Sequence, residues 1–198
     1  ERGLSPARTY ARVMKEFDTL PDNTEITKQF CTYSSGTLIV DGKFVKVRDH
    51  AQKIPFIYAM DYLTHDIPVI QLSIAESGTA FDAFFAKLKD CGYPLKIVVA
   101  DDRSSIDPAL KRYFPDALIQ RCQGHYLENI RLGLHTRTDA THHHFFNSLK
   151  KHVFEEYVDD EKLNKALHHV STQRCEGDLL RQAIVTNIAE RREELFAS

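Results

Sequence analysis

The sequence predicts an α/β protein in which a mixed sheet is followed by a helical region. β-branched and aromatic residues fill three consecutive runs between residues 37 and 74, which is typical of strands. Two shorter apolar runs, 94–101 and 117–122, each follow a segment with helical spacing. After residue 125 only helical spacing is present. These three observations favour strands first and helices last.

The first three strands are predicted over 37–47, 54–63 and 67–74, with short polar turns between them. Short links between consecutive strands predict an antiparallel meander. Next, apolar residues at intervals of three and four predict an amphipathic helix over 81–91. A strand over 94–101, a helix that opens at 105–108 and a fifth strand complete the order β-β-β-α-β-α-β. This order matches the ribonuclease H-like fold.

The rest of the chain is predicted to be helical. One helix is expected before the sheet, over residues 5–18, with Ser5 and Pro6 at its start. The helices after the sheet are expected over residues 125–134, 141–157, 161–170 and 179–196.

The composition is that of an ordinary globular protein, with 198 residues, 42% hydrophobic and 27% charged. No apolar run reaches the roughly 18 residues that a membrane span needs, and no signal peptide is recognisable. The four cysteines are scattered, so we expect reduced thiols and a cytoplasmic location. A net charge of −2 argues against strong binding to DNA through overall charge. Any DNA contact would need a local basic patch or another part of a longer protein.

Two aspartates follow apolar strand residues: Asp41 after 37–40, and Asp101 after 97–100. Strands of α/β proteins often present metal-binding carboxylates at such ends. Two carboxylates suit Mg²⁺ or Mn²⁺, which retain water molecules for phosphate chemistry. The alternative is that Asp41 and Gly42 form an ordinary turn, and that Asp102 is a polar turn residue.

Three elements carry a family resemblance: Val40-Asp41-Gly42-Lys43, the strand that ends in Asp101, and the segment FPDALIQRCQGHYLEN at 114–129. Together they resemble the Mutator-like DDE transposases and their bacterial insertion-sequence relatives, over about residues 30–198. The resemblance implies a ribonuclease H-like catalytic domain with Asp41 as the first acid and Asp101 as the second. Asp102 stands where the relatives more often carry another residue.

The resemblance also implies a reaction: Mg²⁺- or Mn²⁺-dependent DNA cleavage at transposon ends, then strand transfer by the freed 3′-hydroxyl. The partners would be transposon-end and target DNA and further copies of the chain, without a membrane, at the nucleoid of a prokaryotic host. The third acid would be a Glu on a later helix. Glu190, in Thr186-Asn187-Ile188-Ala189-Glu190, is one candidate, although it lies inside a continuous predicted helix. The other is a residue beyond Ser198. Without that acid, the chain would be an inactive transposase-derived module for DNA binding or protein interaction.

The pair Cys122 and His125 has three interpretations: half of a zinc site, a nucleophile with its base, or residues that brace the helical region and shape the site. The resemblance implies the third. Lys43 and Lys46, in a basic cluster with Arg48 and Lys53, are candidate phosphate contacts or simply polar hairpin residues.

The resemblance also gives a domain prediction. Residues 1–30 would be a helical connector from a missing N-terminal DNA-binding region. Residues 31–134 would be the catalytic core, and 135–198 a helical insertion that the chain truncates.

Overall fold

The computed structural model describes residues 11–12, 15, 19–30, 33–46, 51–73, 77–138, 140–157, 159–175 and 177–196. Most of the helix predicted over 5–18, and Arg48, therefore lie outside the described residues. The chain forms two compact units. Unit 1 comprises residues 1–96 and 108–116, and unit 2 comprises 97–107 and 117–198. The strand order of the sheet is β3-β2-β1-β4-β5.

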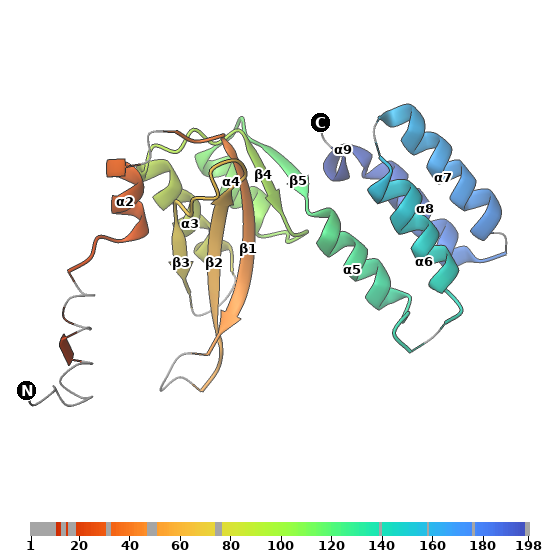
Figure 1. Cartoon of the computed structure of the whole chain (residues 1–198), viewed down its shortest axis with the longest axis horizontal. Helices are drawn as coiled ribbons and strands as arrows, with labels where there is room; N and C mark the ends of the chain where they lie inside the picture. Colours follow the sequence, from red (N-terminus) through yellow and green to blue (C-terminus); the bar gives the residue numbers. More distant parts are fainter. Residues whose placement is uncertain are drawn as a thin grey trace, which may run out of the picture. The chain divides into compact units, whose positions relative to one another are not determined.

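Unit 1 contains the three antiparallel strands β1 (Thr37–Val45), β2 (Ile54–Asp61) and β3 (Ile70–Leu72) (Figure 1). In the register of β1 and β2, Val40 lies opposite Ala59 and Asp41 opposite Tyr58. Helices α2 (Asn23–Phe30) and α3 (Gly78–Asp90) belong to the same unit, as does most of α4 (Ile106–Tyr113), whose first two residues belong to unit 2.

The core of unit 1 follows from the alternation of side chains along the strands. Alternate residues of β1 and β2, among them Leu38 and Ile57, are buried. Helix α3 packs against β3 and buries an aromatic pair, Phe84 and Phe85, whose rings meet edge to face at 5.2 Å between centroids. Burying one such side chain contributes about 1.5–3 kcal/mol, so this apolar face stabilises the meander.

Unit 2 contains the parallel pair β4 (Ile97–Ala100) and β5 (Leu118–Arg121), in register with Ala100 opposite Arg121. Its helices are α5 (Gln123–Gly133), α6 (His143–Leu149), the π-helical turn η1 (Lys150–Glu155), α7 (Asp160–Arg174), α8 (Leu179–Glu190) and α9 (Arg192–Leu195). They enclose a separate apolar core, which includes Phe145, Leu149, Leu163 and Ile188. Asp159 and Asp178 cap α7 and α8 by accepting hydrogen bonds from backbone N–H groups.

The predicted fold class is confirmed, since three antiparallel strands are followed by helical crossovers to parallel strands and then by helices. Among the described residues, no strand follows β5. Two predicted helices are wrong in detail. The helix over 141–157 begins at His143 and changes to π geometry at Lys150, and the helix over 179–196 is interrupted at Arg191. The predicted domain division stays a prediction.

No described helix combines the length and the apolar character that a membrane crossing requires.

Candidate active-site residues

Asp41 lies inside β1 rather than at its end, because the strand continues to Val45. The expectation of a strand-end position and the alternative of an Asp41-Gly42 turn are therefore both wrong. The Asp41 Oδ1 atom accepts a hydrogen bond from the backbone N–H of Gly42 at 2.8 Å, and Oδ2 accepts one from the Tyr58 hydroxyl at 3.2 Å. These contacts orient the carboxylate on the face of β1 opposite to Leu38 and Val40.

Lys43 lies on the same face of β1, two residues beyond Asp41. It is exposed, and its Nζ atom lies 5.8 Å from the centroid of the Tyr58 ring. Lys46 is exposed directly after the strand, and Lys53 is exposed just before β2. Their role as phosphate contacts stays a prediction.

Asp101 directly follows β4, as predicted. Its local arrangement matches that of Asp41: Oδ1 accepts a hydrogen bond from the backbone N–H of the next residue, Asp102, at 2.7 Å. The second carboxylate oxygen lies 3.4 Å from the Arg103 Nε atom. Both predicted acids are thus held by the backbone of the residue that follows them.

Asp102 has much stronger partners than Asp101. Its Oδ2 atom accepts a hydrogen bond from Arg191 Nη1 at 2.6 Å, and the same guanidinium binds Glu194 at 2.7 Å through Nη2. Arg121, which is only 5% exposed, lies between the same two acids, with Nε 3.5 Å from Asp102 Oδ1 and 3.6 Å from Glu194 Oε2. It also donates to Asp107 at 2.6 Å. We call these five residues the arginine–carboxylate network.

The network has an electrostatic signature. The hydrogen bond from Arg191 holds the pKa of Asp102 below its usual range, and the charge of Arg121 acts in the same direction. Hydrogen bonds to Asp102 and then to Glu194 raise the pKa of Arg191. Asp102 and Arg191 are therefore both charged at neutral pH.

Sequence reasoning missed this network. The segment between 186 and 196 contains three glutamates, and the one that joins the network is Glu194, through Arg121 at the end of β5 and through Arg191. Glu190 is exposed at the end of α8. The interruption at Arg191 orients α9, and no Gly or Pro marks that interruption in the sequence. The identity of the third acid stays a prediction.

Cys122 is the residue from which α5 begins. Its N–H donates to the Ala100 carbonyl at 2.7 Å, and its carbonyl accepts from the N–H of Tyr126 at 3.0 Å. The backbone of Cys122 thus links β4 to the first turn of α5, on which His125 is exposed. Among the described residues, no group of three His, Cys, Asp or Glu side chains is arranged to hold a metal ion, so the zinc interpretation lacks a third ligand there. The site-shaping role stays a prediction.

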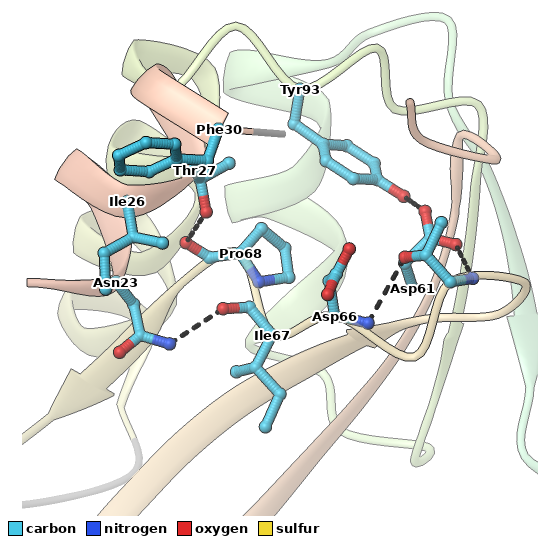
Figure 2. Close-up of a pocket in the computed structure, with 10 residues that line it drawn as sticks. Asn23, Ile26, Thr27, Phe30, Asp61, Asp66, Ile67, Pro68 and Tyr93 are labelled. Carbon is cyan, nitrogen blue, oxygen red and sulfur yellow. Dashed lines mark hydrogen bonds between the residues drawn. The ribbon is translucent and has the colours of Figure 1, made fainter. Parts of the chain in front are cut away.

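Unit 1 also contains a pocket of about 240 Å³ that sequence reasoning did not predict (Figure 2). It lies between α2 and the loop after β2, where Asn23 donates to the Ile67 carbonyl and Thr27 to the Pro68 carbonyl. Its lining residues are Asn23, Ile26, Thr27, Phe30, Asp61, Thr64, Asp66, Ile67, Pro68 and Tyr93.

Asp61 is the buried acid of this pocket and is 1% exposed. One carboxylate oxygen accepts from the N–H groups of Leu63 and Thr64, and the other from the N–H of Ser35 and the hydroxyl of Tyr93. Burial alone would raise the pKa of Asp61, but these hydrogen bonds lower it well below its usual range. Burial and the hydrogen bond to Asp61 raise the pKa of Tyr93. Because four donors occupy the carboxylate, Asp61 organises the loop rather than binding a ligand.

Comparisons with known proteins agree with the resemblance. The transposase for insertion sequence element ISRM5 of Rhizobium meliloti (strain 1021) is 30% identical over 98 residues, which are 46% of this chain and 25% of that protein. The chain thus matches only about a quarter of the length of this relative.

Solved structures of retroviral proteins have lower sequence identity to this chain than the ISRM5 transposase has. The simian T-cell lymphotropic virus intasome in complex with PP2A regulatory subunit B56 gamma gives a TM-score of 0.41 at 10% identity, over 70% of this chain and 48% of that chain. The HTLV-2 integrase catalytic core domain, in complex with magnesium in its dimeric form, gives 0.39 at 10% identity, over 78% of this chain and 97% of that chain.

A family model described as "Transposase, Mutator family" matches residues 31–197, which is most of the chain. This match includes Asp41, Asp101, Cys122 and His125. The chain therefore belongs to the Mutator family of transposases.

Proposed function

We propose that this chain carries the catalytic core of a metal-dependent transposase that cleaves DNA at transposon ends and transfers the freed strand. Asp41 and Asp101 are its metal-binding carboxylates. The observation that carries the proposal is their shared local arrangement: each Oδ1 accepts a hydrogen bond from the N–H of the next residue. This hydrogen bond orients each carboxylate, and carboxylate oxygens are the ligands that hard divalent cations take.

The donor set fits a hard divalent cation. Mg²⁺ and Mn²⁺ take carboxylate oxygens and are bound through one or two carboxylates together with waters and substrate phosphates. Such ions would activate a water or a 3′-hydroxyl for attack on a phosphodiester and stabilise the leaving oxygen. Asp41 and Asp101 would hold them. The longer contacts of their second oxygens, 3.2 Å to the Tyr58 hydroxyl and 3.4 Å to Arg103, are weak enough to yield to a metal ion.

DNA is the proposed partner, with transposon ends and target bound by a homo-oligomer at the nucleoid of a prokaryotic host. Because the net charge of the chain is −2, binding depends on local cations. Lys43 and Lys46 flank Asp41 and would contact phosphates. Within the chain, Glu190 is the candidate for the third acid.

Titration calorimetry with Mn²⁺ tests the proposal on the whole chain and on Asp41→Asn and Asp101→Asn. We expect each substitution to weaken binding by more than about 100-fold, because each removes a ligand rather than a supporting residue, whose loss costs about 10–100-fold. Asp66→Asn, an exposed aspartate after β2, is the matched control and should leave the affinity unchanged.

Equal affinities in all four proteins would contradict the proposed site. DNA binding without Mn²⁺ binding or cleavage would instead identify the chain as an inactive transposase-derived module.

A further inference from the structure

Two adjacent aspartates follow β4, and their surroundings differ. Asp101 is contacted by the N–H of Asp102 and, at 3.4 Å, by Arg103. Asp102 is held by Arg191 at 2.6 Å and lies 3.5 Å from the buried Arg121. The Asp102 carboxylate therefore interacts with two guanidinium groups, while the Asp101 carboxylate is oriented by one short hydrogen bond.

That single hydrogen bond connects the two aspartates. Asp102, whose carboxylate accepts a hydrogen bond from Arg191, also donates its backbone N–H to Asp101 Oδ1 at 2.7 Å. Fixing the side chain of Asp102 therefore limits the motion of the donor that orients Asp101. Partners of this kind, which hold a metal ligand without touching the metal, commonly set its geometry.

The two arginines near Asp102 lie on two different elements of unit 2. Arg121 ends β5 and is only 5% exposed, so its guanidinium has little freedom to move. Arg191 lies at the interruption between α8 and α9, where it also binds Glu194 and stacks its guanidinium 5.8 Å from the centroid of the buried Tyr126 ring. Planar guanidinium groups can hold two carboxylates at once, which a lysine cannot do in the same geometry.

We propose that Asp102, Arg121 and Arg191 are positioning residues that fix the orientation of Asp101 for metal binding, and that Asp102 is not itself a metal ligand. This inference rests on the proposed function for its consequence, the metal affinity. It assigns Asp102 a role in holding Asp101, which the sequence analysis did not predict. It also gives the helical region a direct part in shaping the site, through the residue between α8 and α9.

The experiment compares the whole chain with Arg191→Met and Asp102→Asn, using Arg192→Met as the matched control. Arg192 is the exposed neighbour of Arg191. Hydrogen exchange of the peptide that contains residues 100–104 measures the order of the segment, and Mn²⁺ titration measures the site. Circular dichroism confirms that each variant is folded.

We expect exchange in this peptide to become about 5- to 10-fold faster in Arg191→Met and in Asp102→Asn, and the Mn²⁺ dissociation constant to rise about 10-fold in both. A variant that combines Arg191→Met with Asp102→Asn should show no larger change in exchange or in Mn²⁺ affinity than either single variant, because both substitutions remove the same contact. Arg192→Met should match the unsubstituted chain within about 2-fold on both measurements.

The direction of the change in Mn²⁺ affinity in Arg191→Met distinguishes a positioning role of Asp102 from a role as a metal ligand. If Asp102 were a ligand for which Arg191 competes, removing the guanidinium would tighten Mn²⁺ binding, and this result would overturn the inference. Unchanged exchange in both folded variants would also overturn it. If the unsubstituted chain binds no Mn²⁺, the proposed function fails. The hydrogen-exchange comparison then still tests whether Asp102 and Arg191 hold Asp101 in place.

Discussion

The two units of the chain bury charge in opposite ways. In unit 1 a carboxylate, Asp61, is buried and accepts four hydrogen bonds, all from uncharged donors: three backbone N–H groups and the Tyr93 hydroxyl. In unit 2 a guanidinium, Arg121, is buried among three carboxylates, those of Asp102, Asp107 and Glu194. The first arrangement organises a turn, and the second joins segments that are far apart in the sequence.

The difference predicts how each arrangement responds to change. The stabilisation by Asp61 comes from short hydrogen bonds with uncharged donors, so added salt should change it little. Protonation of the carboxylate removes its charge and weakens these hydrogen bonds. Arg121 depends on ion pairs with side chains that are 37–46% exposed. Such pairs are weakened by solvent and by added salt.

The largest loss of folding stability is expected for Asp61→Asn. The amide NH₂ group would face N–H donors in a buried position, which leaves hydrogen bonds unmade and should cost about 3 kcal/mol in the free energy of unfolding. Urea denaturation measures this loss. Asp66→Asn, on the same loop but exposed, should change stability by less than about 0.5 kcal/mol, and an equal loss in both variants would contradict the role of burial.

A smaller loss, about 1–2 kcal/mol, is expected for Arg121→Met. The substitution removes the cation from three carboxylates, but their partial exposure lets water replace part of the interaction. The measurement is again the midpoint and slope of urea denaturation. A loss above that of Asp61→Asn would reverse the comparison between the two units.

Acid should destabilise the chain through Asp61. Its pKa is lowered in the folded state, so its stabilisation is fully present above the unfolded value, about 3.9, and is lost as the pH falls below it. Between pH 5 and pH 3 this contributes a loss of about 1 kcal/mol. Asp61→Asn should lack this part of the pH dependence, and parallel curves for the two proteins would show that another group is responsible.

The smallest effect concerns salt. At 1 M NaCl the screening length falls to about 3 Å, so the cost of Arg121→Met should shrink by about 0.5 kcal/mol. The cost of Asp61→Asn should stay the same because its partners are uncharged. Denaturation of both variants at low and high salt measures this, and equal salt dependence would remove the distinction between neutral and ionic partners.

The order of strands and helices from β1 onward could be read from local residue patterns. Alternating and helical apolar spacing are read within windows of a few residues, so β1 to β5 were predicted in the right order, although β3 is shorter than expected. The helices after β5 were predicted as a helical region, with wrong bounds at Lys150 and Arg191. Motif spacing likewise led to Asp41, Asp101, Cys122 and His125. Family membership followed from the same residues.

Which polar side chains meet could not be read from such patterns, because it depends on how distant segments pack. Asp61 was an unmarked residue at the end of a strand, and its four donors come from three separate segments of unit 1. Arg191 and Asp102 are 89 residues apart, and nothing in a helical pattern predicts the interruption that brings Arg191 to Asp102. Local spacing specifies secondary structure because it depends on near neighbours, whereas a buried charge is satisfied by whichever segments the packed core brings within hydrogen-bonding distance.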